Sequence, residues 1–158
     1  MRITGVATAF LRNGGRYLLM KRREDRRVYP GIWTGIGGGI DEDEMTDPEK
    51  ACLREILEET GITADKITGL ALRYIHLSTR SFLEGYLLVG YIFFGESSET
   101  SLIKCDEGET FWIPQAEVLK KENTPAIIRI LEHYFSYAIN NEKVYLFNET
   151  ENSIAPLT

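Results

Sequence analysis

Three glutamates spaced for one face of a single helix restrict the fold and function of this chain more than any other feature of its sequence. Asp47-Pro48 is a helix start signal and the glycine at position 61 is a stop signal, so we predict a helix over residues 48–60. Three carboxylates at i, i+3 and i+4 share one side of it: Glu55, Glu58 and Glu59. Another side is apolar: Cys52, Leu53, Ile56 and Leu57. A helix with this pattern packs its apolar side against a larger core.

The crowding of the three carboxylates suggests a metal ion. Nearby like charges disfavour ionisation, and helix propensity gives no reason for the arrangement. Mg²⁺ gives one, because it prefers oxygen ligands and usually takes one or two carboxylates plus substrate phosphates. Arg54 lies beside Glu58 and can hold one carboxylate in position. The alternative interpretation is a solvated acidic face, which is common on glutamate-rich helices.

Charge is unevenly distributed along the 158 residues, whose net charge is −6. Residues 41–59 hold nine acids and two bases, whereas residues 12–27 hold seven bases and two acids. Such clusters are usually solvated faces, but an acidic cluster beside a basic one also suits a divalent cation and a polyphosphate together. The acidic net charge argues against a general nucleic-acid binder.

Length and composition predict a cytoplasmic protein with no membrane partner. A chain of this size buries enough surface to fold without cross-links, and two cysteines are too few for a disulfide scaffold. The longest apolar run, residues 86–94, is too short to cross a bilayer. The first residues lack the apolar segment of a signal peptide.

Apolar and turn patterns predict more strands than helices. We expect a last helix over residues 125–139 and five strands, over residues 3–11, 16–22, 67–77, 84–94 and 109–113. A hairpin turn joins the first two strands, and the glycine-rich residues 35–39 are typical of a loop. This irregular order favours an α+β or mixed α/β fold, with one domain over residues 1–147 and a loose polar tail over residues 148–158.

The segment from Gly38 to Ile62 resembles the Nudix box. That pattern is a glycine, five residues, a glutamate, seven residues, and then Arg-Glu-apolar-any-Glu-Glu-any-Gly-apolar. Gly38 and Glu44 have the first spacing, and residues 54–62 match every fixed position. The departure is nine residues in place of seven between Glu44 and Arg54. We expect the two extra residues to lengthen the loop and to leave the helix register intact.

The resemblance implies a Nudix fold, a mixed central sheet sandwiched between α-helices, and a hydrolase that uses Mg²⁺ or Mn²⁺. It implies that the metal ligands include the carbonyl of Gly37 and the three helix glutamates. These glutamates and Arg54 would be the catalytic residues: Arg54, Glu55, Glu58 and Glu59.

Family members often add an acidic ligand from a later loop, and the candidates here are Asp106, Glu107 and Glu109. Glu107 and Glu109 are better placed relative to Trp112, and the sequence does not choose between them. The general base is also open among Glu55, Glu58 and a later-loop acid.

Basic residues end the second predicted strand, where arginine can hold a phosphate through two hydrogen bonds. We expect one or two of the following to touch substrate: Lys21, Arg22 and Arg23. Gly38 would let the backbone approach the ligand closely. The chain most resembles MutT-type members, which act on oxidised purine nucleoside triphosphates and read the purine with an asparagine before the last helix. Asn123 stands in that place, although it is equally a candidate helix N-cap.

Four aromatic residues are candidates for stacking on a base, although aromatics in strands are more often core: Trp33, Phe82, Phe111 and Trp112. The favoured reaction is hydrolysis of a nucleoside triphosphate, with an oxidised purine nucleotide as a candidate, to the monophosphate and pyrophosphate. The alternatives are a nucleotide sugar, a dinucleotide polyphosphate, an RNA 5′ end, or a non-catalytic nucleotide sensor. We expect a small-molecule nucleotide partner and no long nucleic acid, and the sequence leaves a homodimer open.

Overall fold

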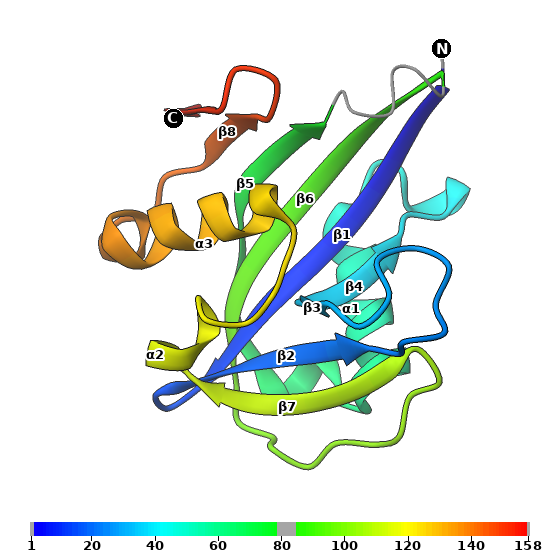
Figure 1. Ribbon diagram of the computed structural model, residues 1–158. Helices are drawn as coiled ribbons and strands as arrows, with labels where there is room; N and C mark the ends of the chain where they lie inside the picture. The colour runs from blue at the N-terminus through cyan, green and yellow to red at the C-terminus, as the bar shows by residue number, and fades with distance from the viewer. Residues whose placement is uncertain (1, 79–84, 158) are drawn as a thin grey trace.

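Two helices pack on opposite faces of one mixed sheet in the computed structural model, which describes residues 2–78 and 85–157 (Figure 1). Its strands are β1 (Arg2–Asn13), β2 (Arg16–Arg22), β3 (Trp33–Thr34), β4 (Ile36–Gly39), β5 (Ile67–Ser78), β6 (Tyr86–Ser97), β7 (Gly108–Pro114), β8 (Tyr145–Asn148) and β9 (Ser153–Pro156). Its α-helices are α1 (Pro48–Thr60), α2 (Gln115–Val118) and α3 (Pro125–Ser136). Helix α3 lies in front of the sheet in Figure 1 and α1 lies behind it.

The sheet contains parallel and antiparallel pairs. Its order is β3-β2-β1-β6-β5-β8-β9, with β4 paired to β1 and β7 paired to β2. The pairs β1–β6 and β5–β8 are parallel, whereas β1–β2 and β5–β6 are antiparallel. This arrangement confirms the predicted mixed sheet between helices.

Alternate residues of the central strands pack into two separate cores, because successive side chains of a strand point to opposite faces. The core under α1 includes Ala7, Ala9, Leu18, Met20 and Phe93 with Cys52 and Ile56 of the helix. The core under α3 includes Phe10, Tyr17, Leu19, Ile92 and Phe94 with Ile130 and Leu131 of that helix. A residue's position in β1, β2, β6 or β7 therefore decides which helix it faces.

Helix α1 begins and ends where the sequence predicts. The Asp47 carboxylate accepts a hydrogen bond of 3.1 Å from the Lys50 amide, and Gly61 ends the helix with a φ of 78°. The buried stripe is rotated from the predicted apolar side, however. Leu57 is 49% exposed, whereas Glu59 is 4% exposed. A carboxylate therefore lies on the interior side of the helix.

The glycine-rich stretch predicted as a loop is largely strand β4, which corrects that expectation. It pairs with β1 in the register Ala7↔Gly38 and Thr8↔Gly37. A Cβ at Gly37 would collide with the carbonyl oxygen of Ala7, so β4 can approach β1 this closely only with glycine there. Glycine is usually depleted in strands, which is why composition indicated a loop.

The expected loose tail is also corrected. Ser153–Pro156 forms β9, which pairs antiparallel with β8 in the register Phe147↔Ile154 and Asn148↔Ser153. Phe147 is buried in the core under α3. Backbone pairing to an existing strand stabilises β9, and its four residues, Ser-Ile-Ala-Pro, are too few to give a clear strand pattern in the sequence.

Other expected elements are confirmed with small changes of boundary. The predicted last helix is α3 followed by a 3₁₀ turn at Ala138–Asn140. The predicted strand 84–94 is β6, and its first expected residue, Glu84, lies outside the described residues. Phe82, a candidate for base stacking, also lies outside them. Across residues 2–78 and 85–157 no helix is both long and apolar enough to span a membrane.

Candidate active site

The backbone of β4 lies beneath the C-terminal half of α1. The Gly37 amide donates a hydrogen bond of 3.2 Å to the Glu59 carboxylate. In a strand, the amide and carbonyl of one residue face the same edge, because a residue exchanges both ladder hydrogen bonds with its partner or neither. The predicted metal ligand, the Gly37 carbonyl, therefore faces the same edge as the Glu59 contact. A Cβ at Gly38 would lie 2.5 Å from the Glu55 carboxylate, so a side chain there would displace that carboxylate.

Glu59 is an ionisable side chain in the protein interior. Burial raises its pKa to about 9, and a hydrogen bond with the Glu107 carboxyl and the negative charges of Glu107 and Glu55 act in the same direction. Burial also raises the pKa of Glu55, against the opposing effect of Arg54. Carboxyls gathered in this way are groups that a bound cation would convert to their charged form.

Arg54 joins the segments that surround these carboxylates. Its Nε and Nη2 donate to Glu44 at 2.7 and 3.0 Å, and Nη2 also donates to the Gly39 carbonyl at 2.9 Å. Its Nη1 donates to Glu55 at 2.8 Å and to Glu58 at 3.3 Å. A planar guanidinium can make these contacts at once, whereas an ammonium group cannot. Arg54 therefore positions the end of β4 against α1.

The two extra residues of the box leave Glu44 in place. The Asp47 amide donates to the Glu44 carbonyl at 2.8 Å, which closes a turn immediately before α1. The Glu44 side chain is 3% exposed, and the hydrogen bonds from Arg54, followed by the one from the Asp41 amide, lower its pKa to about 2. The longer connection is thus absorbed by this turn, as the sequence predicts, and Glu44 remains a charged partner of Arg54.

Of the later-loop candidates, Glu107 reaches the helix glutamates. Its carboxyl contacts that of Glu59, and one of its oxygens lies 3.8 Å from Nη2 of Arg26. The backbone carbonyl of Asp106 accepts a hydrogen bond of 3.2 Å from Nη1 of Arg23. Sequence reasoning did not single out Arg26, and the signal available was its place in the basic run.

Glu109, the other candidate metal ligand of this region, lies on a different side of the sheet. Glu109 lies in β7 opposite Lys21 of β2, four residues before Ile113, and Phe111 lies between them on the same face of the strand. Ile113 belongs to the core under α3, and residues two apart in a strand share a face. Glu109 therefore faces the α3 side, opposite the side that α1 covers.

The basic end of β2 borders a cavity of about 530 Å³, lined by Lys21, Arg22, Arg23, Glu24, Asp25, Glu109 and Phe111. Arg22, a predicted phosphate ligand, donates from Nε to the Val28 carbonyl at 3.1 Å. Arg23, the other, donates from Nε and Nη2 to the Asp25 carboxylate at 3.0 and 2.6 Å. The structure therefore brings both arginines to one cavity, together with Glu24 and Asp25, which the sequence did not single out.

Asn123 precedes α3 but does not cap it. The N-cap is Thr124, whose hydroxyl accepts from the Ile127 amide at 3.4 Å, while the Asn123 side-chain oxygen accepts from the Thr124 amide at 2.7 Å. The same loop packs on β3, because Lys121 lies 4.8 Å from the centre of the Trp33 ring. The capping alternative for Asn123 is therefore wrong, and its predicted contact with a base stays a prediction.

The described residues fit a hard cation, although no three Asp, Glu, His or Cys side chains among them are already gathered as metal ligands. Arg54 Nη1 contacts both Glu55 and Glu58. The donors available are carboxylate and backbone oxygens, which Mg²⁺ and Mn²⁺ prefer. Gly38 leaves the space next to the Glu55 carboxylate open, since a Cβ there would lie 2.5 Å from a carboxylate oxygen.

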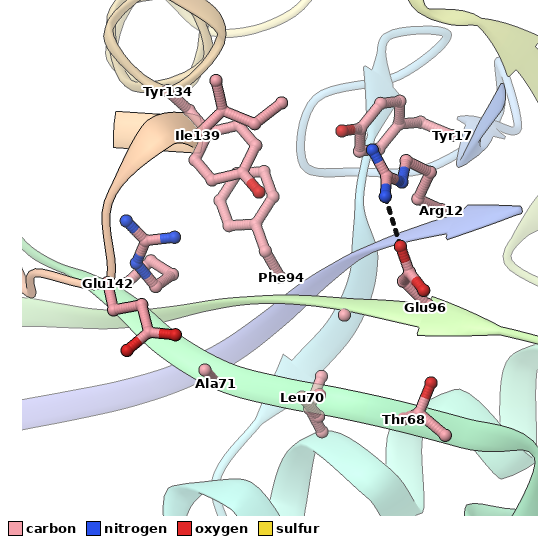
Figure 2. Close-up of a pocket in the computed structure, with 13 residues that line it drawn as sticks. Arg12, Tyr17, Thr68, Leu70, Ala71, Phe94, Glu96, Tyr134, Ile139 and Glu142 are labelled. Carbon is pink, nitrogen blue, oxygen red and sulfur yellow. Dashed lines mark hydrogen bonds and ion pairs between the residues drawn. The ribbon is translucent and has the colours of Figure 1, made fainter. Parts of the chain in front are cut away.

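A larger cavity, of about 760 Å³, lies on the α3 side of the sheet (Figure 2). Figure 2 shows the Arg12–Glu96 ion pair on one side and Glu142 on the other, with Phe94 and Tyr134 between them. The residues that line it include none of those predicted for the site. We therefore place the candidate active site at β4, α1 and the loop before β7.

Comparison with known proteins gives one family. The sequence pattern described as the NUDIX domain matches residues 1–134. A relative from Escherichia coli O139:H28, described as nucleoside triphosphatase NudI, is 43% identical over 61 residues, which are 39% of this chain and 42% of the relative. The chain thus matches less than half the length of such relatives.

Solved structures share the fold. A mutator MutT protein from Bacillus halodurans has a TM-score of 0.69 and 18% identity, over 98% of this chain and 95% of that one. A MutT protein from Methanosarcina mazei Go1 has a TM-score of 0.70 and 24% identity, over 89% of this chain and 97% of that one.

Proposed function

The chain belongs to the NUDIX family, and on that premise we propose that it is a metal-dependent hydrolase of nucleoside triphosphates. The single observation that best supports this is the buried Glu59, which contacts the Gly37 amide and the Glu107 carboxyl beside Glu55. Burying several carboxyls together beside a strand of glycines costs free energy of folding. Such an arrangement is expected where the carboxyls bind a ligand.

Glu55, Glu59, Glu107 and the Gly37 carbonyl would hold Mg²⁺ or Mn²⁺, with Glu58 as a more exposed neighbour. When bound, the metal would supply positive charge that draws electrons from the phosphoryl oxygens, which makes the phosphorus more electrophilic and a bound water more acidic. Arg54 fixes Glu55 and Glu58 relative to β4 through its hydrogen bonds. Arg22 and Arg23 lie at the neighbouring cavity, where they would orient the phosphate chain.

The reaction breaks one P–O bond of the phosphoanhydride. The oxygen of a water molecule bonds to phosphorus, and pyrophosphate leaves with the bridging oxygen. The water's proton goes to a carboxylate, for which Glu55, Glu58 and Glu107 are the candidates. The raised pKa of Glu55 favours proton uptake near neutral pH more than an unshifted carboxylate would.

Asn123 is proposed to read a purine base, because it precedes α3 next to Trp33 and does not serve as the N-cap. An asparagine amide is both donor and acceptor, which suits a purine edge. An oxidised purine nucleotide is therefore a candidate substrate. Nucleotide sugars, dinucleotide polyphosphates and RNA 5′ ends are the alternative substrate classes.

A substrate screen tests this proposal. Purified protein is incubated with nucleoside triphosphates, 8-oxo purine nucleotides, nucleotide sugars and dinucleotide polyphosphates, with Mg²⁺, Mn²⁺ or EDTA, and products are identified by mass. We expect monophosphate and pyrophosphate from a triphosphate, and none with EDTA. Binding without turnover under every metal condition would support the non-catalytic sensor instead.

A further inference from the structure

The guanidinium of Arg23 already holds a carboxylate in the way that it would hold a phosphate. Nε donates to Oδ1 of Asp25 at 3.0 Å and Nη2 donates to Oδ2 at 2.6 Å. Carboxylates and phosphates are both bound by this pair of parallel hydrogen bonds from the arginine fork. Asp25 therefore occupies Nε and Nη2 of Arg23, the two donors that would bind a phosphate.

Arg23 is anchored at the edge of the candidate active site. Its Nη1 donates to the Asp106 carbonyl at 3.2 Å, and its amide donates to the Glu107 carbonyl at 3.1 Å. The Glu107 carboxyl in turn contacts Glu59 of α1. The fork is thus fixed beside the loop that reaches the proposed metal ligands, and it lines the cavity of about 530 Å³.

The pair is placed to exchange partners. The side chains of Arg23 and Asp25 are 53% and 64% exposed, and an exposed ion pair contributes little because water competes for both groups. Asp25 is two residues from Arg23, so its carboxylate stays near the fork after it is displaced. A tethered, weakly held group of this kind competes at high effective concentration.

We propose that Asp25 is an internal competitor for the fork of Arg23, and that it selects substrates with a free terminal phosphate. This rests on the proposed function, which brings a polyphosphate into this cavity. A terminal phosphate carries close to two negative charges at neutral pH, like a phosphate monoester, whereas a phosphate inside a capped diphosphate carries one. The doubly charged group displaces the single charge of Asp25 more readily. A nucleoside triphosphate is therefore favoured over a nucleotide sugar.

The competition between Asp25 and an anion for Arg23 can be measured as a change in the apparent Kd of that anion. When a binding-competent state is only partly populated, the apparent Kd rises by the inverse of that fraction. Removing the competing charge should therefore tighten the binding of an anion. Glu24 provides a matched control, because it lines the same cavity with the same charge and makes no hydrogen bond to Arg23 among the described contacts.

The first test is calorimetric titration of inorganic tripolyphosphate with EDTA present. We expect Asp25→Asn to bind about fivefold more tightly than wild type, and Glu24→Gln to stay within about twofold. In an Arg23→Lys background the gain should disappear, because lysine has no fork. The proposal is overturned if Asp25→Asn matches Glu24→Gln, or if the gain persists with lysine at position 23.

The second test compares substrates with metal present. Asp25→Asn should lower KM more for a nucleotide sugar than for a nucleoside triphosphate, so that the ratio of the two KM values narrows about threefold, with kcat within about twofold. An unchanged ratio overturns the selection. If wild type turns over neither substrate, the proposed function fails, and the metal-free titration still decides whether Asp25 competes for the fork.

Discussion

The guanidinium of Arg54 holds the carboxylate of Glu44 through two hydrogen bonds, of 2.7 and 3.0 Å. The same group reaches the Gly39 carbonyl and Glu55. One side chain therefore connects the end of β4, the turn after it and the glutamate face of α1. The relative position of these three segments depends on a planar group that can donate in several directions.

Arg54→Lys should reduce kcat at least about tenfold, or about 1.4 kcal/mol, because lysine keeps the charge but cannot bind Glu44, Gly39 and Glu55 together. The midpoint of thermal unfolding should also fall by several degrees. Lys50→Gln is the control, since it breaks only an exposed pair with Asp43 and should shift the midpoint by about 1 °C or less. Unchanged turnover and midpoint in Arg54→Lys would contradict the positioning role.

Glu59→Gln should lower kcat at least about 100-fold, equivalent to about 2.7 kcal/mol of barrier. Glutamine keeps the size of the side chain and can still accept the Gly37 hydrogen bond, so the metal-free protein should unfold at an equal or higher temperature. Glu49→Gln, at the exposed start of α1, is the control, and its kcat should stay within about twofold of wild type. Near-normal turnover of Glu59→Gln would remove it from the metal site.

Glu107→Gln and Glu109→Gln should differ sharply, although the two residues are only two positions apart. Glu107 contacts Glu59, whereas Glu109 faces the α3 side of the sheet. We expect the Mn²⁺ concentration for half-maximal activity to rise about tenfold or more for Glu107→Gln and to change little for Glu109→Gln. Titration of activity with Mn²⁺ measures this concentration for each variant. A larger rise for Glu109→Gln than for Glu107→Gln would favour Glu109 as the ligand.

Asn123→Asp and Thr124→Ala separate base reading from helix capping. Thr124 caps α3, so its replacement by alanine should reduce the free energy of unfolding by about 1 kcal/mol and leave base preference unchanged. Asn123→Asp should preserve stability but change the kcat/KM ratio between purine and pyrimidine triphosphates about tenfold, because aspartate lacks the donor. An equal effect on every nucleotide would count against base reading.

Stability should fall in mild acid partly through His76. This side chain is buried, and burial lowers its pKa below the usual 6.5 more than the Glu149 carboxylate, 3.1 Å away, raises it. The unfolded chain therefore binds a proton first as pH falls. The stabilisation is complete above about pH 6.5 and is lost progressively below it.

Urea unfolding at pH 7 and pH 5.5 measures this effect. The pKa of His133 is also lowered, by burial and by Arg129, so the comparison must be between wild type and a variant. His76→Gln should lose less unfolding free energy between the two pH values than wild type does. An equal loss in both proteins would show that His76 does not titrate on unfolding.

Local signals in the sequence determined the elements that depend on local chemistry. The cap at Asp47, the stop at Gly61 and the spacing of the glutamates specified α1 to the residue. The Asn13-Gly14-Gly15 turn and the apolar pattern after it specified the β1–β2 hairpin. These features are visible locally because hydrogen bonds and φ values within a few residues decide them.

Contacts between distant residues decided the rest. Sequence spacing alone could not show that Glu107 meets Glu59 while Glu109 faces α3, because the register of β7 on β2 sets the face of each residue. It also could not place Glu59 inside: the helix wheel put it with the charged side, and the interior side of α1 is fixed by β4 beneath it. Pairing to β8 likewise made a strand of the polar C-terminal segment. The sequence determined which residues could do the chemistry, and tertiary packing decided which of them meet, because strand register and helix rotation are set by burial against partners far away in the chain.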